Sequence, residues 1–275
     1  MRLPDRTTFD TPKAPSMTAT LAGQRALITA GASGIGLAIA SAFQAAGARI
    51  VVCDVEAAAL ERTRQAHPDW GVLSCDVSRR DQVDAMFATT AERYGGALDI
   101  LVNNAGIAGP TGGIETLDPD EWERTIAVNL TGVFLVTRRA VPLLRAAGGG
   151  AIINLSSAAG KLGFPLRTPY SASKFGIVGL TETLAMELGP DQIRVNAILP
   201  GVVAGERQDR VLAAKAAAIG ISLDEQRQRA VARVSMRTMV QADDIAQAAL
   251  YLAGPTGRYV SGERLSVGGN LESLS

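Results

Sequence analysis

Short apolar runs alternate with longer helical segments along almost the whole chain, and this alternation most constrains the fold. The runs are too short to be helices, whereas the segments between them repeat apolar residues with helical periodicity. Strands that alternate with helices favour a parallel sheet with helices on both faces. We therefore predict an α/β fold with a doubly wound parallel sheet, formed by a single domain over residues 17–275.

Seven strands and six main helices are predicted from this pattern. The strands are Ala26–Ala30, Arg49–Cys53, Val72–Ser74, Ile100–Asn103, Ala151–Leu155, Arg194–Ile198 and Arg264–Val267. The helices are Ile35–Ala46, Val55–Ala66, Arg79–Tyr94, Pro119–Ala147, Tyr170–Leu188 and Ala242–Ala253. The fourth helix has a clear start, because Asp118 can cap it, Pro119 suits the first helical position and acidic residues follow.

Charge and cysteine content exclude several classes of protein. Basic and acidic residues both number 27, so no net positive charge attracts nucleic acid or an anionic membrane. Cys53 and Cys75 are too few for a disulfide framework, and no secretory leader is recognisable, which favours a cytoplasmic protein. The single histidine, His67, lies in a predicted turn, so we expect neither a metal site nor a Ser-His-Asp hydrolase.

Two segments need separate interpretation. Residues 1–16 are polar, contain three prolines and lack apolar periodicity, which predicts a disordered leader. Met17 is then the start of the folded part or an alternative translation start. Ala26–Ala48 has no charged residue and is long enough to cross a bilayer, but its glycines and polar residues fit a buried strand, a turn and a helix better. No membrane partner is predicted.

A glycine-rich segment, residues 29–36, follows the first predicted strand and opens the first helix. Glycines there let the backbone approach a pyrophosphate, and the start of the helix offers N–H groups. The alternative is an ordinary glycine-rich turn. The strand before and the helix after favour a dinucleotide loop. Its cofactor-binding residues are predicted to be Gly31, Ser33, Gly34, Ile35 and Gly36.

The second predicted strand is followed by Asp54, eighteen residues after Gly36. A carboxylate there can accept hydrogen bonds from the adenosine ribose and repels a 2′-phosphate, so NAD is predicted in preference to NADP. The alternative role for Asp54 is to cap the next helix. Cys75 and Asp76 end the next strand in the same way, which favours two reduced core cysteines on adjacent strands.

Tyr170 and Lys174 stand four residues apart, with Ser156 and Ser157 a short distance upstream. On a helix the Tyr and Lys side chains share one face. A phenol has a pKa of about 10, and a nearby ammonium group favours the phenolate, which suits acid–base chemistry on an alcohol or a carbonyl. Taken alone, this spacing more often marks a solvated helix face.

From about Leu21 to Gly269, an ordered set of motifs resembles the short-chain dehydrogenase/reductase family in its compact, Rossmann-like form. The motifs are the glycine loop, Asp76-Val77, Asn103-Asn104-Ala105-Gly106, Asn129 within Val-Asn-Leu-Thr-Gly-Val-Phe, Ser157, Tyr170, Lys174 and Pro200-Gly201. Taken singly, Asn129 would be a tolerated polar residue and the Asn103 motif a turn. Their joint occurrence in this order is specific.

The resemblance implies a role for each matching residue. Tyr170 would be the acid–base and Ser157 would bind the substrate oxygen, while Ser156 would support the strand end. Lys174 would lower the Tyr170 pKa and hold the nicotinamide ribose, and Asn129 would bind a water that links Lys174 to solvent. The implied cofactor contacts, besides the glycine loop, Asp54, Tyr170 and Lys174, are Asp76, Val77, Asn103, Ala105, Gly106, Pro200, Gly201 and Val203.

Two positions depart from the family pattern. The glycine loop usually begins Thr-Gly, whereas Ala30 stands second here, which implies a slightly shifted loop. Gly205 replaces a Thr that often contacts the nicotinamide carboxamide, so that contact must come from backbone or from another residue.

Residues 203–237 form a long connection, predicted as two helices broken at Gly220-Ile221-Ser222. The resemblance implies a mobile lid over the substrate at this place. The segment holds seven basic residues against four acidic ones. One interpretation is two solvated helices whose charges face water. The other is that Arg207 or Arg210 turns inward to hold a carboxylate.

The resemblance implies hydride transfer between NAD and a secondary alcohol or ketone, such as a polyol, a sugar-like alcohol or a cyclic alcohol. One alternative is a 3-oxoacyl-thioester (acyl carrier protein) reductase, which would usually prefer NADP. Another is a non-catalytic NAD-sensing or scaffold protein. The apolar faces of helices 119–147 and 170–188, with the family's usual assembly, imply a homo-oligomer, expected to be a tetramer.

Overall fold

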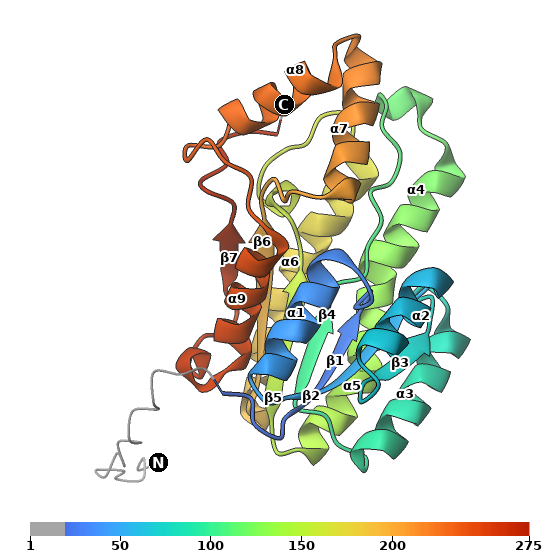
Figure 1. Cartoon of the computed structure of the whole chain (residues 1–275), viewed down its shortest axis with the longest axis vertical. Helices are drawn as coiled ribbons and strands as arrows, with labels where there is room; N and C mark the ends of the chain where they lie inside the picture. Colours follow the sequence, from blue (N-terminus) through green and yellow to red (C-terminus); the bar gives the residue numbers. More distant parts are fainter. Residues whose placement is uncertain (1–19, 275) are drawn as a thin grey trace, which may run out of the picture.

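The computed structural model describes residues 20–274, so the predicted leader, residues 1–16, lies outside the described range. The strands are β1 (Arg25–Thr29), β2 (Arg49–Asp54), β3 (Gly71–Ser74), β4 (Ile100–Asn103), β5 (Gly150–Leu155), β6 (Ile193–Pro200) and β7 (Arg264–Val267). They form one all-parallel sheet in the order β3-β2-β1-β4-β5-β6-β7. The predicted doubly wound parallel sheet is confirmed (Figure 1).

The predicted strands are all present. The ends of β4 and β7 are as predicted, and each of the other strands shifts at one or both ends by one or two residues. The largest change is in β6, which runs beyond the predicted end at Ile198 to Pro200, opposite Val267 of β7. Proline lacks the N–H group that a ladder would need, so it is tolerated at the end of a strand but not within it.

Nine α-helices lie in residues 20–274. They are α1 (Gly34–Ala45), α2 (Ala57–Ala66), α3 (Arg80–Tyr94), α4 (Pro119–Ile126), α5 (Gly132–Ala146), α6 (Thr168–Leu188), α7 (Glu206–Ile219), α8 (Leu223–Ala232) and α9 (Ala242–Ala253). The long connection after β6 contains the two expected helices, α7 and α8, which end and begin around Gly220 and Ser222. Gly220 adopts a φ of +73°, the left-handed conformation that suits glycine at the end of a helix.

The helix predicted over Pro119–Ala147 is divided by a π-helical turn at Ala127–Thr131, which separates α4 from α5. Its start is as predicted, because the Asp118 side chain accepts a hydrogen bond from the Asp120 N–H at 2.9 Å. In the described part of the chain, Pro119–Ala146 is the one helix long and apolar enough to cross a membrane by length and composition. Since α5 contributes buried residues to the core, we infer that it is a core helix.

Two apolar layers bury the faces of the sheet. Helices α1 and α9 pack over residues such as Ile28 and Ile153, whereas α3, α5 and the end of α6 pack over Leu27 and Ile152. Successive residues of a strand point to opposite faces, which is why neighbours in the chain join different layers. With both faces covered, the carboxyl edge of the sheet is where loops and side chains meet a ligand.

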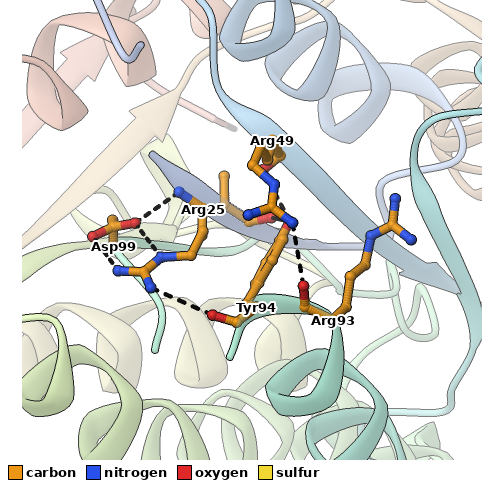
Figure 2. A network of polar contacts seen from close by, with 6 residues as sticks. Arg25, Arg49, Arg93, Tyr94 and Asp99 are labelled. Carbon is orange, nitrogen blue, oxygen red and sulfur yellow. Dashed lines mark hydrogen bonds and ion pairs between the residues drawn. The ribbon is translucent and has the colours of Figure 1, made fainter. Parts of the chain in front are cut away.

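A polar network fastens the opposite, amino-terminal edge of the sheet (Figure 2). Arg25, the first residue of β1, forms a two-pronged ion pair with Asp99, just before β4, with Nε–Oδ2 at 2.7 Å and Nη2–Oδ1 at 3.0 Å. The Asp99 carboxylate also accepts the backbone N–H of Arg25. The Tyr94 hydroxyl lies 2.9 Å from the carbonyl oxygen of Arg49, whose guanidinium covers the Tyr94 ring. These contacts stabilise the amino-terminal edge of the sheet.

We expect Asp99→Asn to lower the free energy of unfolding by about 2 kcal/mol at pH 7, because Arg25 loses its carboxylate partner. Burial acts to raise the pKa of Asp99, but the hydrogen bonds and the charge of Arg25 outweigh it and hold that pKa below its usual value. The pair therefore stabilises the fold fully above a pH of about 4, and the stabilisation is lost as the pH falls through the lowered pKa. Urea unfolding at several pH values measures both effects.

Asp191→Asn is a suitable control for that experiment. Asp191 forms a surface ion pair with Arg145 at 2.7 Å, in which the two side chains are 34% and 53% exposed. Such pairs contribute about 0–1 kcal/mol. The prediction would be contradicted if both variants lost the same free energy of unfolding. It would also be contradicted if the stability of Asp99→Asn fell with decreasing pH as that of the parent does.

Candidate active site

The glycine loop connects β1 to α1 at the carboxyl edge of the sheet. The Gly31 N–H donates to the Cys53 carbonyl at 3.0 Å, which ties the loop to the end of β2. Ala30, where the family usually has glycine, adopts a φ of +48°. This left-handed conformation costs an alanine about 1–2 kcal/mol, which the surrounding contacts must offset. The loop is present despite the substitution.

Other atoms pack closely against Gly31 and Gly36, whereas the start of α1 stays exposed. A Cβ on Gly36 would lie 2.1 Å from the Ala30 carbonyl oxygen, and one on Gly31 would lie 2.6 Å from Cγ1 of Val52. Ser33 and Gly34 at the start of the helix are exposed. Their position suits a pyrophosphate, because the N–H groups of a first helical turn have no partner within the helix. The residues present therefore fit a dinucleotide.

Asp54 lies beside this loop at the end of β2 and is 8% exposed. Its Oδ2 accepts the Ala32 N–H at 3.3 Å, and its Oδ1 accepts the N–H groups of Val55 at 2.8 Å and Glu56 at 3.2 Å. These bonds hold a carboxylate against the loop. They also correct the predicted start of α2, because Val55 and Glu56 are kept in a turn and the helix begins only at Ala57.

The segment after β3 lies next to this region. Cys75 contacts Cys53 of β2, and both are buried free thiols, as predicted. The hydrogen bond with Cys75 and burial raise the pKa of Cys53 well above its usual value, so Cys53 is an unreactive core thiol. The Asp76 carboxylate accepts hydrogen bonds from the N–H and the hydroxyl of Ser78, while buried Val77 packs against the start of α5.

Asn103, the last residue of β4, and Asn104 after it have side chains that point in different directions. Asn103 is buried and donates to Thr137 and Asn154 inside the domain, so its side chain faces away from the edge. Asn104, which the sequence interpretation did not select, donates from Nδ2 to the carbonyls of Thr29 and Ala30, both at 3.0 Å. It therefore braces the glycine loop. The only feature of the sequence that could have indicated this role for Asn104 was its position beside Asn103.

Tyr170 and Lys174 of α6 and Asn129 of the π turn lie at the same edge, and Ser157 follows two residues after the end of β5. Lys174 is 3% exposed, and its Nζ donates to the Leu155 carbonyl at 2.7 Å. The same Nζ lies 5.6 Å from the centre of the Tyr170 ring. A Cβ on Gly106 would lie 3.6 Å from Nζ and 3.2 Å from Oδ1 of Asn129, so Gly106 leaves the room in which these groups meet.

The two adjacent serines have different surroundings. Ser156 is buried, and its Oγ donates to the carbonyl of Lys174 at 2.8 Å. It thus supports the junction of β5 and α6, as predicted. Ser157 is half-buried, and its Oγ accepts the Ala159 N–H at 3.1 Å. That bond does not use the hydroxyl hydrogen of Ser157, which suits donation to a ligand oxygen.

Asn129 is fully buried in the π turn, a feature that often marks functional sites. Its Oδ1 accepts the Ile107 N–H at 2.7 Å, and its Nδ2 donates to the Ile107 carbonyl at 3.0 Å. Nδ2 also reaches Ser173 Oγ at 3.1 Å, one residue before Lys174. Asn129 therefore holds the loop after β4 against α6. The expected water link to Lys174 stays a prediction.

Arg167 is a site residue that the sequence interpretation missed. It is 3% exposed and lies directly before α6. Its guanidinium carbon is 5.4 Å from the ring centres of both Phe164 and Tyr170, and Nη2 donates to the Ala108 carbonyl. The only feature of the sequence that pointed to Arg167 was its place three residues before Tyr170. An exposed loop arginine could occupy the same place, so this feature was not specific.

A cavity of about 400 Å³ lies next to this cluster, because Gly106 and Arg167 line it, although none of the four cluster residues does. The loop after β4 forms one wall, Arg167 another, and α7 a third through Arg210, Val211 and Ala214. Of the two predicted inward arginines, Arg210 thus lines the cavity, whereas the side chain of Arg207 lies outside the described part of the chain. Helices α7 and α8 stand at this end of the molecule (Figure 1).

The segment after β6 passes close to the last strand before it reaches α7. Gly201 donates its N–H to the Val267 carbonyl at 2.9 Å, and a Cβ on it would lie 2.7 Å from Gly268. Val203 forms a parallel bridge with Val240. Gly205 precedes α7 with a φ of +137°, a conformation that glycine adopts readily because it has no side chain. Across residues 20–274, no group of three histidine, cysteine or acidic side chains could hold a metal ion.

Known proteins resemble this chain over nearly its whole length. A family model described as enoyl-(acyl carrier protein) reductase matches residues 29–270. The chain is 34% identical to 2-(R)-hydroxypropyl-CoM dehydrogenase of Xanthobacter autotrophicus over 253 residues, which cover 89% of this chain and 96% of that protein. It is 44% identical to trans-4-hydroxycyclohexanecarboxylate dehydrogenase of Sinomonas cyclohexanicum over 188 residues, or 65% and 71% of the two chains.

A solved structure leads to the same family. The structure of a variant of actinorhodin polyketide ketoreductase with NADPH matches with a TM-score of 0.86 at 36% identity, covering 93% of this chain and 99% of that chain. Together with the glycine loop, these relatives indicate a nicotinamide cofactor. The chain belongs to the short-chain dehydrogenase/reductase family and is an oxidoreductase that acts on CH–OH groups.

Proposed function

We propose that the protein transfers a hydride between NAD(H) and the carbon of a secondary alcohol or ketone, while Tyr170 moves the proton. The observation that carries the proposal is the buried Lys174 ammonium, 5.6 Å from the Tyr170 ring and one helical turn away. The bound cofactor supplies or accepts the hydride at its nicotinamide ring. A polyol, a sugar-like alcohol or a cyclic alcohol is the preferred substrate class.

Each residue of the cluster has a distinct part in this reaction. The Lys174 charge, held by the Leu155 carbonyl, favours the phenolate form of Tyr170, so the phenol can take a proton from an alcohol or return it to a ketone oxygen. The Ser157 hydroxyl orients the same oxygen. Asn129 positions Ile107 and Ser173 and so keeps the loop and α6 in place. Asp54 binds the adenosine ribose.

The choice of NAD over NADP depends on Asp54. A carboxylate already bonded to the Ala32 N–H would face the 2′-phosphate of NADP, which is unfavourable for two negative charges. We expect kcat/KM to favour NAD(H) at least tenfold, a difference of about 1.4 kcal/mol. Steady-state kinetics with both cofactors and a panel of polyols, cyclic alcohols, hydroxy acids, steroids and acyl thioesters tests the function.

Two outcomes would contradict this assignment. Equal kinetics with NADP(H) would refute the NAD preference, and no turnover of any compound with either cofactor would favour an NAD-sensing or scaffold protein. Asp54→Asn should lower the ratio of kcat/KM with NAD(H) to kcat/KM with NADP(H). The control Asp84→Asn, at an exposed position on α3, should leave this ratio unchanged. A ratio that stays the same in Asp54→Asn would assign the preference to other residues.

A 3-oxoacyl-thioester reductase is the second candidate. The similar solved structure is a polyketide ketoreductase with NADPH, and the matching family model is described as enoyl-(acyl carrier protein) reductase. Asp54 is unfavourable for this alternative, because such reductases usually prefer NADP. Faster reduction of an acetoacetyl thioester with NADPH than of any cyclic ketone with NADH would establish it.

The protein is also proposed to be a cytoplasmic homo-oligomer, with a tetramer expected. Three large apolar side chains on α5 and α6 are exposed: Phe134 at 50%, Phe175 at 46% and Met186 at 82%. A second copy would remove them from water. The free thiols of Cys53 and Cys75 suit a reducing compartment. A monomer in light scattering at micromolar concentration would contradict the assembly.

A further inference from the structure

We infer that Arg167 and Arg210 form an anion-binding subsite in the cavity beside Tyr170, so that the preferred alcohol or ketone carries a carboxylate group. This inference rests on the proposed function, because it takes the cavity to be the place where the alcohol binds. It narrows the proposed substrate class to alcohols and ketones that also carry a carboxylate, that is, to hydroxy acids and oxo acids.

The cavity receives two cationic side chains from separate elements. Arg167 reaches it from the turn before α6, and Arg210 reaches it from α7. The remaining described lining residues are Gly106, Ile107, Ala108, Gly109, Thr111, Val211 and Ala214, none of them acidic. Thr111 has the one other polar side chain in this lining, and two guanidinium groups beside a mostly apolar surface suit a planar anion attached to an apolar body.

Arg167 is prepared for such a contact before any ligand arrives. Its guanidinium lies against the rings of Phe164 and Tyr170 and donates to the Ala108 carbonyl, so few conformations remain for it. It is 3% exposed, and a cation that is largely removed from water interacts strongly with an anion. Because Arg167 contacts Tyr170, an anion bound by Arg167 lies near the proton-transfer group. The anion itself takes no part in the chemistry.

The surroundings of Arg167 add further positive charge. Lys215 of α7 lies over the Phe164 ring at 5.1 Å, and its Nζ donates to the Leu274 carbonyl at 2.9 Å. Burial and the charges of Arg233 and Arg167 lower the pKa of Lys215. An anion between α7 and the turn before α6 would relieve this repulsion.

Arg210 differs from Arg227 and Arg229 of α8, the next helix of this connection. Arg227 and Arg229 form close ion pairs with Asp209 at 2.9 Å and Glu225 at 2.7 Å, as expected for solvated helix surfaces. Arg210 lines the cavity and has only a 4.0 Å contact with Glu206 at an exposed surface. A contact this long contributes little, so Arg210 can turn to a bound carboxylate and draw α7 toward it.

Binding without turnover provides the direct test. Cyclohexanecarboxylate and hexanoate have no hydroxyl or keto group to react, and their amides are neutral matches. Calorimetry on the enzyme saturated with NADH should show each carboxylate binding at least tenfold more tightly than its amide. Arg167→Met and Arg210→Ala should each weaken the carboxylates at least tenfold and leave the amides within about twofold.

Two control variants accompany this experiment. Arg229→Ala removes the same charge from an exposed site on α8 and should change nothing. Arg167→Lys keeps the charge but not the planar fork, so it should retain part of the carboxylate preference even if Arg167→Met is poorly folded. Equal affinity of the parent for acids and amides, or equal losses for both in the Arg210→Ala variant, would overturn the subsite.

A kinetic comparison separates this inference from the proposed function. The parent and the Arg210→Ala variant are assayed with 4-hydroxycyclohexanecarboxylate, its amide and cyclohexanol, with NAD as cofactor. Carboxylate binding without turnover of any alcohol would overturn the function and support the subsite. Turnover of the neutral alcohols with no preference for the acid would support the function and overturn the subsite.

Discussion

Tyr170→Phe is expected to reduce turnover by roughly 10² or more while leaving NADH affinity unchanged, because a positioned proton donor typically contributes that much. The substitution removes one oxygen and keeps the ring, whose edge-to-face contact with Phe164 and whose contact with Arg167 do not involve the hydroxyl. The site should therefore keep its shape. The measurements are kcat with protonated and deuterated substrate, and the dissociation constant of NADH from a fluorescence titration.

Tyr259→Phe provides the matched control. Tyr259 is 79% exposed and lies outside the cluster, so the loss of its hydroxyl should leave turnover unchanged. Near-parental turnover in Tyr170→Phe, with an isotope effect showing that hydride transfer limits the rate, would mean that another group moves the proton.

Gly36→Ala is expected to weaken NADH binding by about 100-fold, equivalent to about 2.7 kcal/mol. The new Cβ would lie 2.1 Å from the Ala30 carbonyl oxygen and 2.6 Å from Nδ2 of Asn104. Neither neighbour can stay in place, so the brace between Asn104 and the loop would break and the first turn of α1 would shift. Overpacking of this kind costs about 1–3 kcal/mol of stability as well.

The same titration and a thermal melt test this prediction. Gly163→Ala is the control, because no heavy atom lies within 4 Å of a Cβ built on Gly163. It should keep the parental affinity and melting temperature. Parental NADH affinity in Gly36→Ala would show that the close packing of the loop does not determine cofactor binding.

The type and order of the main elements could be predicted because their signals are local. The two-sided apolar run of β4 and the alternation of strands with helices lie within short stretches of chain. The cap formed by Asp118 needs only two further residues. The spacing of Tyr170 and Lys174 on one helix is local in the same sense, and α6 confirms it.

The predicted helix boundaries were less accurate where a contact with a distant segment of the chain changes the local backbone. The early start predicted for α2 was wrong because the Asp54 carboxylate, which also bonds the glycine loop, holds Val55 and Glu56 outside the helix. The division of the fourth helix by the π turn at Ala127–Thr131 was also missed. There the buried Asn129 meets Ile107, 22 residues earlier in the chain.

By itself, the sequence determined the parallel α/β architecture, the glycine loop and the residues available for acid–base chemistry, because each depends on patterns within a few residues. Only the tertiary structure decided which side chains face the site. The Asn104 side chain rather than that of Asn103 braces the loop, because its Nδ2 donates to the Thr29 carbonyl across 75 residues of chain. Arg167 is a buried cation because Phe164, Ala108 and Tyr170 surround it. The direction in which each of these side chains points depends on contacts between distant segments, and local periodicity does not encode those contacts.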